Sequence, residues 1–309
     1  GNHFGEIIWA RFASDSEIGD QYYNGLGKKK DFSIFSKATY RLNNKISLFG
    51  DLQMRFVNYK TSGLTSDRVN MLIDENYNFF NPKAGITYKL NPENNLYFSY
   101  ARANREPSRS DFESNPNIKP EQLNDFELGW RHNTNALIIN TNVYYMLYNE
   151  QLVLSGAIDN TGAPIRTNSG ASYRLGLEIE ATVQVSKKFA IQPNLTFSSN
   201  KNKQTISQID GELVDLGKTN ISFSPEFVAA NALIYQPVSN LQLSFLSKYV
   251  GEQFMGNTDS EASKLGSYFV NDLNVSYEIK PKSIFKSILV SALVNNIFGE
   301  KYVSNGYYY

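Results

Sequence analysis

The chain has 309 residues, and its 30 Lys and Arg balance its 30 Asp and Glu, so the formal net charge is zero. A neutral chain lacks the basic excess that attracts phosphate backbones, which argues against nucleic acid as a partner. The absence of cysteine excludes disulfides, thiolate metal sites and cysteine nucleophiles from this chain. The longest apolar run, at 288–294, is far shorter than the ~20 residues of a membrane-spanning helix.

Alternation of apolar and polar residues, the period of a β-strand, recurs along almost the whole chain, whereas helical periodicity is rare. The last alternating segment is apolar at both odd and even positions, so its orientation stays open. We count about 12 strands. In chain order they cover 32–42, 46–56, 84–90, 96–100, 126–130, 137–147, 173–186, 189–197, 228–234, 241–245, 273–279 and 288–298.

Segment 173–186 shows the alternation most clearly. Its odd positions, from Tyr173 to Val185, are all apolar, whereas its even positions include Arg174, Glu178 and Glu180. One face therefore meets hydrocarbon or a protein core. Because a Lys or Arg in the middle of a lipid-facing surface costs about 2–4 kcal/mol, we expect the charged positions to face inward.

The connections between these segments alternate in length. A soluble sandwich shares the two-residue period but has no physical reason to place every long loop at one end. Short turns at one end and long loops at the other are typical of outer-membrane barrels, so we predict an all-β, antiparallel transmembrane β-barrel. The short turns fall at 43–44, 91–94, 133–135, 186–188, 237–240 and 280–283, and the long excursions at 60–76, 101–121, 155–172, 200–222, 251–267 and from 300 onward.

Aromatic residues gather near the ends of the predicted strands. Amphipathic rings favour membrane interfaces, so we expect these residues to form the girdles of the barrel. They are Tyr40, Tyr59, Tyr88, Trp130, Tyr249 and Tyr277.

Several motifs resemble the barrel of TonB-dependent receptors, and they extend over essentially the whole chain. The resemblance implies a barrel of about 22 strands closed around an N-terminal plug, in the outer membrane of a Gram-negative bacterium. On that count residues 1–309 form the C-terminal part of the barrel, without the plug, the energy-coupling box, about the first nine strands and the last strand. The motifs are NPKAGITY at 81–88, LYFSY at 96–100, NREPS at 104–108, NPNIKPE at 115–121, FELG at 126–129, YRLGLEIE at 173–180, KYVG at 248–251 and VNNIF at 294–298.

The resemblance also implies a function, namely import of a ligand driven by a TonB–ExbB–ExbD complex that acts on the missing plug. Receptors of this size resemble importers of metal complexes, so the expected ligand is a ferric siderophore or another metal complex. The stretch 105–118 is similar to the paired boxes of haem receptors, but 108–114 holds no His, which weighs against haem. We expect no catalytic residue, no cofactor and no resident metal.

Two other functions stay open. A passive porin would share the strand pattern but would have no plug. An outer-membrane phospholipase needs a His beside its Ser nucleophile near the outer leaflet. His132 instead abuts the short turn at 133–135, and His3 lies outside the predicted strands.

Loop residues supply the candidate ligand contacts. Arg can grip carboxylates or catecholates in a fork, and Tyr offers a rigid stacking surface, although the same side chains could pack the loops against one another. Lys28, Lys29 and Lys30 precede the first predicted strand and would face lipopolysaccharide or solvent. The candidate ligand contacts are Tyr22, Tyr23, Arg105, Arg109, Arg166, Phe254, Tyr307 and Tyr308.

Overall fold

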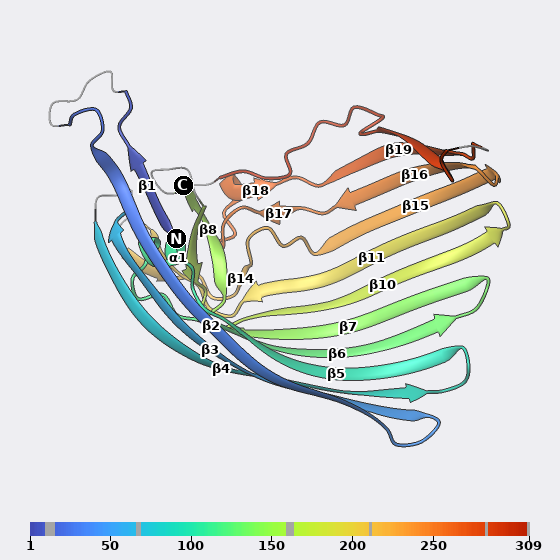
Figure 1. Cartoon of the computed structure of the whole chain (residues 1–309), viewed down its shortest axis with the longest axis horizontal. Helices are drawn as coiled ribbons and strands as arrows, with labels where there is room; N and C mark the ends of the chain where they lie inside the picture. The colour runs from blue at the N-terminus through green and yellow to red at the C-terminus, as the bar shows by residue number, and fades with distance from the viewer. Residues whose placement is uncertain (10–15, 66–68, 159–163, 210–211, 282–283, 308–309) are drawn as a thin grey trace.

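The computed structural model describes residues 1–9, 16–65, 69–158, 164–209, 212–281 and 284–307, and it contains one large antiparallel sheet that curves like part of a barrel wall (Figure 1). All 12 predicted strands occur, and β1 adds a short strand at one edge. The strands lie side by side in chain order: β1 (Asn2–Glu6), β2 (Gln21–Arg41), β3 (Ile46–Leu64), β4 (Asn70–Lys89), β5 (Asn94–Arg105), β6 (Glu121–Asn133), β7 (Leu137–Asn149), β10 (Ser172–Ser186), β11 (Phe189–Asn202), β15 (Phe227–Val238), β16 (Leu241–Val250), β19 (Tyr268–Ile279) and β20 (Ile288–Val294).

Most connections separate by length onto the two ends of the sheet, as predicted. The exceptions are the β3–β4 connection, which is short although it lies at the long-loop end, and the β19–β20 connection, which is longer than the turns beside it. Figure 1 shows the short turns together on the right and the longer connections on the left. The longer connections hold small elements: α1 (Arg109–Ser114), β8 (Leu152–Ile158) with β9 (Pro164–Asn168), β12 (Ile206–Ile209) with β13 (Glu212–Asp215), β14 (Thr219–Asn220), β17 (Gln253–Phe254) with β18 (Lys264–Leu265), and the 3-10 helix η1 (Glu261–Ser263). Neither helix among the described residues is long and apolar enough to cross a membrane.

The predicted long loop at 60–76 is wrong, because most of it is strand. β3 continues to Leu64 and β4 begins at Asn70, and the two strands stay paired from Ile46 with Tyr88 up to Leu64 with Asn70. Apolar alternation is lost there because this hairpin extends past the membrane, where neither face has to meet lipid.

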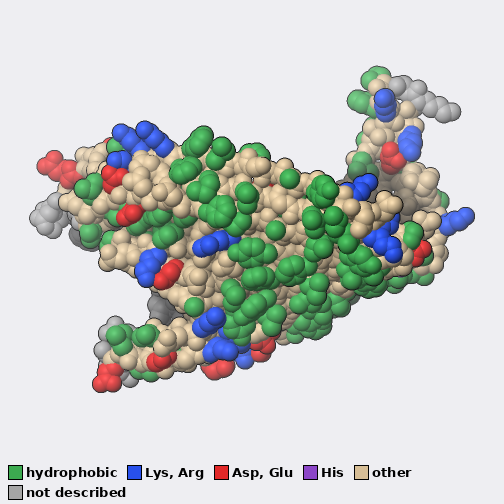
Figure 2. Space-filling model, turned by 90° about the horizontal axis from the view of Figure 1, so that it is seen from below, with side chains coloured by type: hydrophobic (Ala, Val, Ile, Leu, Met, Phe, Trp, Pro, Cys, Tyr) green, Lys and Arg blue, Asp and Glu red, His purple; other side chains and the backbone are tan. Residues whose placement is uncertain are grey.

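The register of the strands separates an apolar outer face from a polar inner face. One row of directly paired residues crosses eight strands and is apolar throughout. The adjacent row is small or polar at most positions. Figure 2 shows hydrophobic side chains gathered in a band on the convex face, with charged side chains on both sides of the band. The apolar row is Tyr40, Leu48, Ile86, Phe98, Leu128, Val143, Leu177 and Phe197, and the adjacent row is Thr39, Phe49, Gly85, Ser99, Glu127, Tyr144, Gly176 and Ser198.

The apolar outer face is exposed rather than covered by a second layer. Within the described part of the chain, seven of the eight residues in the apolar row are among the large exposed hydrophobic side chains, the exception being Leu177. A soluble protein rarely leaves so large an apolar surface uncovered, whereas a lipid bilayer covers it. The sandwich alternative is therefore excluded, and the predicted fold class of a transmembrane barrel is confirmed.

The orientation of β20, which the sequence left open, follows from its pairing. Val290 is opposite Tyr277 and Ala292 is opposite Val275, so the even-numbered residues of β20 share the apolar outer face. The strand ends at Val294, before the predicted Phe298. β1 and β20 are the two edges of the described sheet, which is therefore open.

We expect an introduced arginine to destabilise the protein more on the outer face of β10 than on its inner face. Ile179→Arg, at the centre of the outer face, should lower the free energy of unfolding of the full-length protein in lipid vesicles by about 2–4 kcal/mol. The matched variant Thr182→Arg, on the inner face, should cost much less, because the lumen is polar. Denaturant unfolding measures both values. Equal losses would contradict the assignment of the two faces.

Candidate functional site

The loop between β5 and β6, residues 106–120, folds inward onto the wall formed by β2, β3 and β4. Phe112 of α1 is 3% exposed and stacks on Tyr59 of β3, with ring centroids 6.1 Å apart. Met71, Ile118 and Leu152 complete this buried cluster. Burial of a Phe of this kind stabilises by about 1.5–3 kcal/mol. The prediction that Tyr59 belongs to an aromatic girdle is wrong, because its ring packs on the loop instead of meeting the membrane.

A cluster of four charged side chains joins the same loop to the wall. Arg55 of β3 donates from Nη1 and Nη2 to the two carboxylate oxygens of Glu106, both at 2.9 Å, and from Nη2 to Asp31 at 2.6 Å. Lys29 donates to Glu106 at 2.5 Å. The side chain of Glu106 is 9% exposed. Burial raises the pKa of Glu106, but hydrogen bonds from Lys29 and Arg55 outweigh burial, and the pKa lies below its usual value.

Arg109, a predicted ligand contact, is engaged within the protein. Its guanidinium donates to Glu113 at 2.8 Å and to Thr61 Oγ1 at 2.6 Å, with longer bonds to the carbonyls of Ser62 and Asn24. These bonds fasten α1 to β2 and β3, which is the loop-packing role considered as the alternative.

Three other cations gather at the β8–β9 hairpin with their side chains open to solvent. Arg105 donates to the carbonyl of Leu152 at 3.3 Å and is 51% exposed. Arg166, on β9, lies 4.0 Å from Asp111 of α1 and is 40% exposed. The backbone of Lys119 donates to Asn168 of β9, and its side chain is 65% exposed. The structure thus unites two predicted arginines with Lys119, which sequence reasoning missed although it lies in the NPNIKPE motif.

The predicted aromatic contacts do not join this group of cations. Tyr22 and Tyr23 are neighbours on β2 with an edge-to-face ring contact, centroids 6.3 Å apart. Phe254 of β17 lines a hollow of about 500 Å³, together with Phe227 and Tyr249 at the long-loop ends of β15 and β16. Tyr307 is exposed, and Tyr308 lies outside the described residues.

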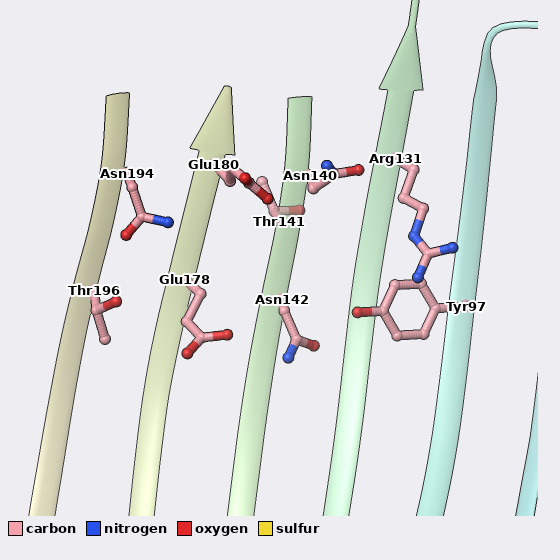
Figure 3. Close-up of a pocket in the computed structure, with 9 residues that line it drawn as sticks. All are labelled: Tyr97, Arg131, Asn140, Thr141, Asn142, Glu178, Glu180, Asn194 and Thr196. Carbon is pink, nitrogen blue, oxygen red and sulfur yellow. The ribbon is translucent and has the colours of Figure 1, made fainter. Parts of the chain in front are cut away.

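A polar recess of about 590 Å³ lies in the inner wall, in the half of the sheet nearer the short turns. Figure 3 shows the nine lining side chains on five neighbouring strands, β5, β6, β7, β10 and β11. The guanidinium of Arg131 lies 4.7 Å from the ring centre of Tyr97. Among the described residues, Glu178 and Glu180 form no salt bridge. Such a surface suits a polar or cationic occupant rather than an apolar one.

Of the two histidines, His132 contacts an asparagine side chain. His132 Nδ1 lies 3.0 Å from Asn94 Oδ1, and its ring lies beside Trp130 at the short-turn end of the sheet. The part of the chain that is described holds no group of three or more His, Asp or Glu residues arranged to bind a metal ion.

Comparisons with known proteins agree with this geometry. The family model "TonB dependent receptor-like, beta-barrel" matches residues 5–297. The ferrioxamine receptor of Yersinia enterocolitica is 23% identical over 260 residues, which are 83% of this chain and 34% of that receptor. The siderophore receptor PiuA of Acinetobacter baumannii has a TM-score of 0.72 at 19% identity, covering 93% of this chain and 41% of PiuA. The ferric citrate transporter FecA has a TM-score of 0.71 at 17% identity, covering 93% of this chain and 43% of FecA.

The chain spans 34% of the length of the ferrioxamine receptor and 41–43% of the two solved receptors. At these identities the solved structures show the fold. The predicted localisation in the outer membrane of a Gram-negative bacterium is confirmed by the family and by its neighbours. With the family model matched over nearly the whole chain, the protein belongs to the TonB-dependent receptor-like β-barrels, a family of transport receptors rather than of enzymes.

Proposed function

We propose that the intact protein is an outer-membrane receptor that imports a ferric siderophore or a related metal complex, with energy from a TonB–ExbB–ExbD complex that acts through a plug domain. Residues 1–309 are then the C-terminal part of the barrel, and the remaining strands close the wall around the plug. The observation that carries this proposal is the inward-folded β5–β6 loop with its exposed cations, at the long-loop end of a wall that is apolar outside and polar inside. The names of the similar receptors support the same ligand class.

The two alternatives have less support. The family of the chain, the TonB-dependent receptor-like β-barrels, weighs against a passive porin. A phospholipase needs a general base beside its Ser near the outer leaflet, whereas His132 contacts Asn94 at the short-turn end of the sheet. We therefore propose that the protein catalyses no reaction.

We propose that Arg105, Lys119 and Arg166 contact the anionic groups of the metal complex. The side chains of Arg105, Lys119 and Arg166 are 51%, 65% and 40% exposed, respectively. Among the described residues, Arg105 donates from Nη2 alone, to Glu121 at 3.4 Å and to the Leu152 carbonyl at 3.3 Å, and Arg166 approaches Asp111 through Nη1 at 4.0 Å. Lys119 is paired with Glu150 at 2.7 Å, so a ligand would have to share or displace that carboxylate. Arg109 is a positioning residue in this scheme, and Tyr22, Tyr23, Phe254, Tyr307 and Tyr308 are secondary contacts.

Uptake by a receptor-deletion strain tests this proposal. Cells that produce the full-length receptor should take up iron-55 from at least one of ferrioxamine B, ferric citrate and a ferric catecholate. The double variant Arg105→Ala and Arg166→Ala should bind that complex about tenfold or more weakly, because each charged hydrogen bond is worth about 1.5–3 kcal/mol. Lys280→Ala, which breaks an exposed ion pair with Glu278 at the short-turn end, is the control. Uptake of none of the three complexes by the wild type would refute the import proposal, and unchanged affinity in the double variant would refute the contacts.

We also propose lipopolysaccharide as a lipid partner on the outer wall. At ~3.3 Å per residue and a tilt of about 45°, the outward positions from Phe32 to Leu42 span about 23 Å of height, close to the thickness of an apolar band. Lys30 and Lys28 come next on the same face. Lys28 is directly opposite Lys60 of β3, and Lys60 is paired with Asp74 at 2.6 Å. The three side chains together keep one net positive charge, which an anionic phosphate would balance. Leu26, Lys28, Lys60 and Asp74 help to line a hollow of about 190 Å³ there.

Lipid-dependent stability tests the proposed contact. Lipid A in the vesicles should raise the unfolding midpoint of the full-length receptor relative to phosphatidylcholine alone. The variant Lys28→Ala with Lys60→Ala should lose most of that increment, because the phosphates lose their counter-charges, while Lys280→Ala should keep it. An equal increment in all three proteins would contradict a site at these lysines.

A further inference from the structure

We propose that Arg55 is a positioning residue for ligand binding. By holding Glu106 and Asp31 together, it fixes the β5–β6 loop against the inner wall. It thereby sets the position of the three proposed ligand contacts, Arg105, Lys119 and Arg166, which we call the binding mouth. This inference rests on the proposed import function. Arg55 lies on β3, in the wall, and the loop residue it grips is 51 positions away in the sequence. It acts through Glu106, which directly follows Arg105 in the chain.

The guanidinium of Arg55 satisfies two carboxylates at once. Nη1 and Nη2 grip the two oxygens of Glu106, while Nε and Nη2 reach Asp31. A planar guanidinium offers this double fork, and a lysine ammonium does not. Lys29 adds a third contact to Glu106 and lies 3.5 Å from Asp31. Two cations therefore balance two anions. Arg55 and Glu106 are the more buried pair, at 22% and 9% exposed, and Lys29 and Asp31 are open to solvent.

Removal of Arg55 leaves Glu106 in an unfavourable place. With its side chain only 9% exposed, the carboxylate would keep Lys29 alone as a charged partner, and a buried charge that loses its partner is strongly destabilising. The loop can relieve that cost by leaving the wall. The charged cluster is therefore a latch, defined as Lys29, Asp31, Arg55 and Glu106, and its strength depends on the fork of Arg55.

The position of Glu106 affects the binding mouth because the residues that connect them, Pro107, Ser108 and α1, are held firmly in place. Pro107, which follows Glu106, is fully buried and has a restricted backbone. Ser108 directly precedes α1, and its backbone N–H and its hydroxyl both donate to Asp111, at 2.7 and 2.8 Å. Asp111 is the residue that Arg166 of β9 approaches. A shift at Glu106 thus moves Arg105 directly and Arg166 through α1.

Acid should open the latch, because Glu106 must lose its charge. Its pKa lies below the usual value of 4.5, and a carboxyl whose pKa is lowered by folding stabilises the structure above its unfolded pKa and loses that contribution as the pH falls through the folded value. Lys29, Asp31 and Arg55 are the charged groups that face it. The latch is therefore closed at neutral pH and loses the contribution of Glu106 only as the pH falls through its lowered pKa.

Hydrogen exchange on the full-length receptor in lipid vesicles measures the latch without any ligand. In Arg55→Ala the protection factors of amides 106–120 should fall about tenfold, and in the wild type they should fall as the pH drops through the lowered pKa of Glu106. Glu106→Ala should match Arg55→Ala, and the double variant should be no worse than either single variant, because both act through one contact. The control Lys280→Ala should keep the protection of the wild type. Unchanged protection in Arg55→Ala, or additive effects of the two substitutions, would overturn the latch.

Binding of the iron-55 complexes of ferrioxamine B, citrate and a catecholate gives the second readout. For the complex that the wild type binds, Arg55→Ala should lower the affinity about tenfold at unchanged amounts of receptor in the membrane. A loosened loop with undiminished affinity would overturn the positioning role. If the wild type binds none of the three, the import proposal fails, and the latch is then judged on hydrogen exchange alone.

Discussion

The strand register is the constraint on which the rest of the structure depends. A row such as Tyr40, Leu48, Ile86 and Phe98 stays apolar across successive strands because each residue is directly opposite the next. A slip of one residue would exchange the two faces and bring charges such as Glu178 into contact with lipid. The membrane thus selects one register, and that register decides which side chains line the lumen.

The loops depend on the same wall. β3 and β4 continue beyond the apolar band, and their inner face offers Arg55, Tyr59 and Thr61 as partners for the β5–β6 loop. From the loop, Glu106 binds Arg55, Phe112 stacks on Tyr59 and Arg109 donates to Thr61. An ion cluster, an aromatic stack and a charged hydrogen bond therefore act at three points along one loop. The cations that we propose as ligand contacts are therefore positioned by strands as well as by the loop backbone.

The two-residue period of the sequence predicted those features of the fold that contact with lipid determines. Lipid imposes a two-residue period, so all 12 strands that meet it were found from the sequence, together with the inward orientation of charges such as Arg131 and Glu178 and the placement of long loops at one end. The extension of β3 and β4 was missed because its outward positions are polar above the membrane, for example Asn58 opposite Asn76 and Lys60 opposite Asp74, while its apolar residues lie on the inner face. Short β1 carries too few residues to show a period.

The two-residue period does not predict which side chains far apart in the sequence contact each other. Arg109 is a surface cation in the sequence, and only folding brings it to Thr61, 48 residues away. The same holds for Arg55 with Glu106, and for Lys119, whose place beside β9 depends on the hairpin that precedes β10. Tyr59 lies near the end of a predicted strand like the girdle aromatics, yet the loop covers it.

Accessibility of single introduced cysteines tests the central claim that the sheet spans the outer membrane with its long connections outside. Because the chain has no cysteine of its own, each introduced thiol is the only one in this part of the receptor. On intact cells, a membrane-impermeant maleimide should label Glu261→Cys, in η1 of a long connection, and should label Lys187→Cys, in the β10–β11 turn, only after the outer membrane is permeabilised. Labelling of both positions on intact cells would contradict the account.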